Sequence, residues 1–181
     1  MKNQILSFIC FLSFSINGQN LADTIPICKN AISLELVGSS CNVLSIHYDR
    51  IIKKNKKSFY SIDIGVGYMP YLASYKSNQI IGTSIAIDWN NKLYKKNHVS
   101  AGIGLAYSDG LFQYGFPDET KESRKVVFAS LRLGYKFQKP TKGLFFKLMA
   151  TPIFRIYEFS DVPYSAPSIF PLIGIGVGYS F

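Results

Sequence analysis

A strict alternation of apolar and small residues is the feature that most constrains this chain, and it is clearest at the C-terminus. The final stretch, PLIGIGVGYSF, places Ile173, Ile175, Val177, Tyr179 and Phe181 at every second position. The residues between them are glycines and a serine. A period of two indicates a β-strand, because successive side chains of a strand point to opposite faces. The chain therefore ends in a strand with one apolar face and one nearly bare face.

The same alternation recurs along the chain, and no segment shows the period of a long amphipathic helix. Eight segments carry it, at residues 31–39, 43–52, 58–68, 79–89, 98–107, 125–137, 143–153 and 170–181. None of these regions contains an apolar run of about 18 residues, so the pattern excludes a helical membrane span. The repetition is one of hairpins, which predicts an all-β fold of eight antiparallel strands in up-and-down order.

The N-terminus has the organisation of a secretory signal peptide. Lys2 is followed by an apolar run from Ile5 to Ile16 and then by small or polar residues, and that run is too short to span a membrane. We therefore expect a signal peptide at 1–19, a short N-terminal periplasmic segment at 20–30 and one barrel domain at 31–181.

Two cysteines, Cys28 and Cys41, follow the predicted signal peptide. An exported protein could pair them. However, they bracket a predicted strand of about ten residues, roughly 33 Å long, whereas a disulfide needs Cα atoms within about 7 Å. We expect no bond between them.

The connections between the segments alternate in character. KKNKKS, NNKLYKKNH and QKPTKG are short, rich in lysine and free of acids, whereas most of the other connections are longer and aromatic. The net charge of +9 could suggest nucleic acid, but these turns carry no aromatic platform beyond Tyr94. A rim beside anionic lipid headgroups explains the lysines better, so we expect no nucleic-acid partner. In the connection at 108–123, Phe112, Tyr114 and Phe116 are the candidates for an outside contact, and the alternative is a loop that packs on itself.

Three features indicate that the apolar face points outward. The other face is mostly glycine, serine and alanine, which suits a narrow interior better than a surface in water. Tyr and Trp residues stand at the ends of the apolar stripes, as in the aromatic girdles of membrane barrels. Each stripe is about nine to eleven residues long, which is the length of a tilted transmembrane strand. Because lipid cannot satisfy an open sheet edge, the sheet must close, and the prediction becomes a transmembrane β-barrel.

With this pattern, the chain resembles the small eight-stranded outer-membrane barrels of Gram-negative bacteria, of the OmpA and OmpX type. The terminal strand carries the resemblance, with its final Phe181 and apolar residues at every second place before it. The resemblance implies an outer-membrane location and a terminal strand that the outer-membrane assembly machinery engages, through Ile173, Ile175, Val177, Tyr179 and Phe181. It also implies that this strand closes against the first one.

The inward face carries charges whose signs divide along the chain. The acids come from the first half and the bases from the second, and the set is Glu35, His47, Asp49, Asp63, Asp88, Arg132, Lys136 and Lys147. An eight-stranded barrel is filled by its side chains, and buried charges must be paired. We therefore expect an ion-pair network that plugs the lumen, and the alternative is a narrow pore for small solutes or ions.

Catalysis has little support in the sequence. His47 and His98 are the only histidines, and no metal-ligand spacing, phosphate loop or nucleophile elbow is present. The stretch HVS at 98–100 faintly resembles the His-x-Ser element of outer-membrane lipid A deacylases, but it lacks a following Asn and lies beside a basic turn. We expect no enzyme activity and no cofactor, and a lipid-modifying enzyme is the weaker alternative. A soluble ligand-binding barrel would need an apolar cavity in place of the charged one.

The expected function is structural or interactive. The barrel would sit in outer-membrane lipid and present its extracellular loops to a partner, for adhesion or envelope integrity.

Overall fold

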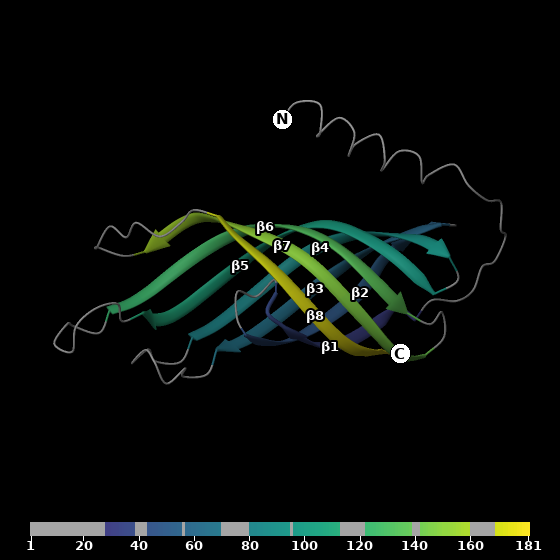
Figure 1. The fold of residues 1–181 in the computed structure, drawn as a ribbon, viewed down its shortest axis with the longest axis horizontal. Coiled ribbons are helices and arrows are strands. Elements are labelled where there is room, and N and C mark those ends of the chain that lie inside the picture. The colour runs from purple at the N-terminus through teal and green to yellow at the C-terminus, as the bar shows by residue number, and fades with distance from the viewer. Residues whose placement is uncertain are drawn as a thin grey trace, which may run out of the picture.

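The computed structural model describes residues 28–38, 43–55, 57–69, 80–94, 96–112, 122–138, 142–159 and 169–181. These ranges hold eight strands: β1 (Asn30–Leu36), β2 (Leu44–Lys54), β3 (Ser58–Met69), β4 (Ile80–Tyr94), β5 (Asn97–Phe112), β6 (Glu122–Gln138), β7 (Gly143–Phe159) and β8 (Ile169–Ser180). Figure 1 shows them wound around one axis, each tilted against it. Within the described ranges, no helix has the length and apolarity needed to cross a membrane.

Each strand pairs antiparallel with the next, and β8 closes the barrel against β1. In this last pairing Ala31 lies opposite Ser180 and Leu36 opposite Ile175. Beyond the strand end, the backbone N–H of Phe181 donates to the carbonyl of Asn30 at 2.9 Å. The predicted fold, an eight-stranded antiparallel up-and-down barrel that closes through its terminal strand, is confirmed.

The middle strands are longer than the alternation predicts. The segment expected at 98–107 is part of β5, which continues to Phe112, and Asp109 still pairs with Lys125 of β6. The predicted connection at 108–123 is therefore shorter in the structure, because β6 begins at Glu122. The reason is that strands pair through backbone groups, so pairing continues where the apolar alternation stops.

Pro152 lies inside β7, well away from either end of the strand. It faces Pro171 of β8, and on its other side the pairing with β6 is interrupted between Ser130 and Leu133. A proline has no N–H for the ladder, which accounts for the gap. The inward and outward alternation of β7 still holds from Leu144 to Ile153.

The barrel has a polar interior and an apolar exterior. Among the described residues, nineteen polar or charged side chains are buried against eight hydrophobic ones. Large aliphatic side chains point outward instead, and Ile103 and Ile173 are 65% and 67% exposed. This is the reverse of a water-soluble protein, in which apolar side chains fill the core.

Candidate functional site in the charged lumen

Arg132 of β6 is buried inside the barrel and contacts two acids, Asp88 of β4 and Asp63 of β3. Its Nε lies 3.0 Å from Asp88 Oδ1, and its Nη1 donates to Asp63 Oδ1 at 3.3 Å. All three side chains are almost fully buried. Buried charges are tolerated only when they are paired. Arg132 therefore links β6 to β3 and β4 through these two ion pairs.

Lys147 of β7 forms the second cluster, with acids from β1 and β3. Its Nζ lies 2.6 Å from Glu35 Oε2 and 3.9 Å from Asp63 Oδ2. His47 completes this cluster, with Nδ1 2.7 Å from Asp63 Oδ1 and Nε2 3.9 Å from Glu35 Oε2. Asp63 therefore belongs to both clusters and links them.

A third pair lies nearer the end of the barrel where the chain terminates. Lys136 Nζ donates to Asp49 Oδ2 at 3.0 Å and also sits 4.6 Å from the centre of the Phe145 ring. Asp49 is the most accessible of the paired lumen acids, with 15% of its side chain exposed. This pair is therefore better solvated than the two clusters further inside.

Two glycines make the two central contacts sterically feasible. Gly102 of β5 lies in register between Asp88 and Arg132, and Gly176 of β8 lies in register between Lys147 and Glu35. A Cβ at Gly102 would come within 2.1 Å of Asp88 Oδ1, and one at Gly176 within 2.6 Å of Lys147 Cε. In both places the charged side chains meet across a strand that has no side chain there.

The eight lumen residues expected from the sequence all belong to these three groups. Sequence reasoning missed two further members, Ser45 and Phe145. The Ser45 hydroxyl lies 2.9 Å from His47 Nε2, and Phe145 lies beneath the Lys136 ammonium. The alternation places both on the inward face, but it does not indicate which charged group each one contacts.

Ser45, His47 and Asp63 have the hydrogen-bond order of a catalytic triad, with a hydroxyl on one imidazole nitrogen and a carboxylate on the other. However, all three side chains are at most 2% exposed, and Asp63 is also held by Arg132 and Lys147. The HVS element assembles no such chain in the described residues, because Ser100 Oγ donates to Met149 Sδ at 3.7 Å and His98 stacks edge-on with Phe59. The described residues also contain no cluster of His, Cys, Asp and Glu side chains fit to hold a metal ion.

The residues predicted as an assembly signal belong to the outer face and the end of the terminal strand. Ile173, Ile175, Val177 and Tyr179 point outward from β8, and Phe181 follows its last residue. Their role in assembly stays a prediction. Phe112 is the last residue of β5, and Tyr114 and Phe116 fall outside the described residues, so the contact loop also stays a prediction. Cys28 is a free, half-buried cysteine, whereas Cys41 is outside the described residues.

No protein-family model matches the chain, and no curated protein matches it. A solved structure that resembles it is the crystal structure of the N-terminal beta-barrel domain of Pseudomonas aeruginosa OprF, with a TM-score of 0.49 and 11% sequence identity. The match covers 84% of this chain and 95% of that chain. The fold assignment rests on the strand pairings of the chain itself.

Proposed function

We propose that the protein is a non-enzymatic outer-membrane barrel whose lumen is closed by ion pairs and whose extracellular loops carry its interactions. The observation that supports this most strongly is the inverted polarity of the barrel. A closed sheet satisfies every backbone group internally, and an apolar exterior over a polar interior suits lipid outside and not water.

Aromatic residues at both ends of the apolar band support the same orientation. Tyr60, Trp89 and Tyr135 lie towards the end with the lysine-rich turns, and Tyr68 and Tyr107 lie towards the other end. Such residues favour the interface between hydrocarbon and headgroups. The signal peptide expected at residues 1–19 would supply the export step, and the terminal strand would be the segment that the assembly machinery engages.

The three ion-pair groups support a closed lumen. Arg132 and Lys136 each reach acids of strands on the other side of the barrel, with Arg132 bonded to Asp63 of β3 and Lys136 to Asp49 of β2. A barrel of eight strands leaves an interior only wide enough for side chains to fill. We therefore place the function on the outside of the barrel, in the loops, and not on transport through it.

Single-channel conductance in a planar bilayer tests this proposal. The mature wild-type protein should give no steady current, and Arg132→Ala should open one, because the central crossing contact is removed. Arg50→Ala is the matched control, since Arg50 is an arginine exposed on β2, and it should remain closed. A steady, ion-selective current from the wild type would refute the plug and make the protein a channel.

A further inference from the structure

A groove on the outside of the barrel crosses β4, β5 and β6, where small residues interrupt the apolar surface. Ala101 lies between Trp89 and Leu133 of the neighbouring strands, and Ala129 lies between Leu105 and Phe154. Two hollows of about 430 and 700 Å³ result, and their linings are almost wholly apolar. They share Ile87, Ile103 and Leu131, so they form one continuous groove.

The groove has the length of one leaflet of a bilayer. Its lining includes the outward residues of β4 from Trp89 to Ile85, and a third hollow continues it to Thr83. The six steps from Thr83 to Trp89 correspond to about 20 Å along the strand, and a tilt of about 45° reduces this to a depth of about 14 Å, close to the roughly 15 Å of half of the hydrocarbon core. An extended acyl chain matches this shape and this lining.

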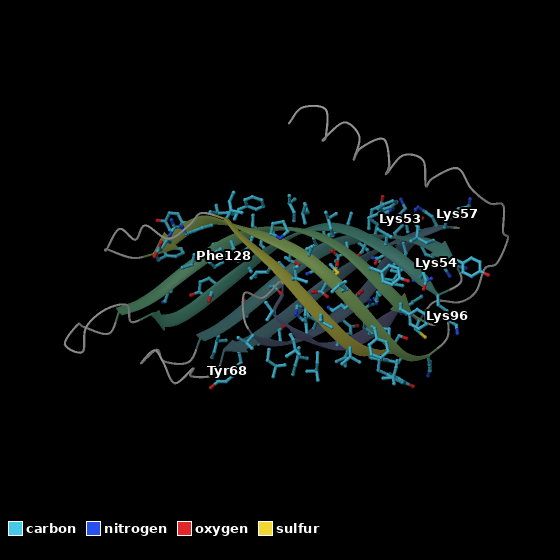
Figure 2. All side chains as sticks on the ribbon, in the orientation of Figure 1. Lys53, Lys54, Lys57, Tyr68, Lys96 and Phe128 are labelled. Atoms are coloured by element: carbon cyan, nitrogen blue, oxygen red, sulfur yellow. The ribbon has the colours of Figure 1, made fainter. Side chains whose placement is uncertain are left out.

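The end of the groove at Trp89 opens towards a basic rim. Lys53 pairs with Tyr60, which in turn pairs with Trp89. Lys92 follows Trp89 by three residues, and its N–H donates to the carbonyl of Lys57 at 2.9 Å, so these two lysines belong to adjacent chain segments. Figure 2 shows Lys53, Lys57 and Lys96 at one end of the barrel, with Lys53 and Lys57 at its upper edge and Lys96 below them.

This rim lacks compensating acids among the described residues. Asp49 and Asp88 are the described acids nearest to it, and they point into the lumen, where Lys136 and Arg132 hold them. The acids Asp109 and Glu158 lie towards the opposite end of the barrel, where Lys125 pairs with Asp109 of β5. Exposed lysines next to an aromatic girdle attract phosphate headgroups, and this attraction weakens as salt screens it.

We propose that this face binds one anionic phospholipid, with an acyl chain in the groove over Ala101 and the headgroup phosphate at Lys53, Lys57 and Lys96. The site rests on the proposed membrane location and adds a lipid class and a position to it. The lipid would come from the leaflet on the side of the chain termini, where the basic rim lies.

Trp89 is the only tryptophan of the chain and lines this groove, so its fluorescence reports directly on the site. The mature protein is refolded into vesicles that contain either phosphatidylglycerol or phosphatidylcholine with brominated acyl chains, and quenching of Trp89 gives the relative association of the two lipids. At low salt we expect phosphatidylglycerol to be favoured by about fivefold or more, the effect of one lysine near an anionic headgroup. In 1 M NaCl the ratio should fall towards one.

Substitutions test whether the lysines and the groove cause this preference for phosphatidylglycerol. Lys53→Gln combined with Lys57→Gln and Lys96→Gln should bring the ratio to about one, and Ala101→Leu should reduce quenching by both lipids. Lys125→Gln, an exposed lysine on β6 at the other end, is the matched control and should leave the ratio unchanged.

The outcomes separate the two proposals. Equal quenching by both lipids in the wild type, or an unchanged ratio in the triple variant, would overturn the anionic lipid site and leave the membrane barrel intact. Absence of quenching by either lipid would overturn the membrane location itself, and the lipid site with it.

Discussion

Replacement of Arg132 by methionine tests whether the lumen charges hold the barrel together. The substitution keeps most of the side-chain volume but removes the contacts to Asp88 at 3.0 Å and to Asp63 at 3.3 Å. Asp63 still contacts His47 at 2.7 Å and Lys147 at 3.9 Å after this change. Asp88 therefore loses a larger share of its compensating positive charge than Asp63 does. Removing one partner of a buried ion pair costs about 3–5 kcal/mol, because the remaining charge has left water without compensation.

The double variant Arg132→Met with Asp88→Asn is the control for this reasoning. It removes the unpaired carboxylate of Asp88 together with the guanidinium. The free energy of unfolding should therefore return to within about 1–2 kcal/mol of the wild-type value. Reversible urea unfolding in lipid vesicles, followed by Trp89 fluorescence, measures both free energies of unfolding. A loss below about 1 kcal/mol for Arg132→Met, or a double variant as unstable as the single one, would refute an uncompensated buried charge as the cause.

Three further changes test other parts of the fold. Val37 has a left-handed backbone with φ of 50°, which costs a β-branched residue about 1–3 kcal/mol, so Val37→Gly should raise the urea midpoint, and a lower midpoint would contradict the strain. Gly176→Val should destabilise the barrel by about 1–3 kcal/mol, because its Cβ would displace the Lys147 stem from Glu35, and unchanged unfolding would show that Lys147 has room to move. Deletion of Phe181 should lower the amount of protein inserted in the outer membrane of producing cells while refolding in vitro persists, and equal insertion would exclude a terminal assembly signal.

The alternation of side chains was sufficient to predict the class of fold. Eight stripes with small residues between them, as in 58–68 and 170–181, indicate strands and also which face is apolar. Period two is a local property of the chain, because each residue's face depends only on its neighbours. For the same reason the inward position of all eight lumen charges could be read before any pairing was known.

The partner of each lumen charge could not be predicted from this alternation. The register of β4, β5 and β6 brings Arg132 against Asp88 across Gly102, and the closure of β8 against β1 brings Lys147 against Glu35 across Gly176. These partners depend on the register of every intervening strand and on the tilt that closure imposes, and neither is encoded in a local pattern. The continuation of β5 to Phe112 and the position of Pro152 inside β7 depend on backbone pairing in the same way. The sequence by itself thus determined which faces are apolar and which residues point inward, whereas the tertiary structure decided which charges meet, because that choice is made across the barrel and not along the chain.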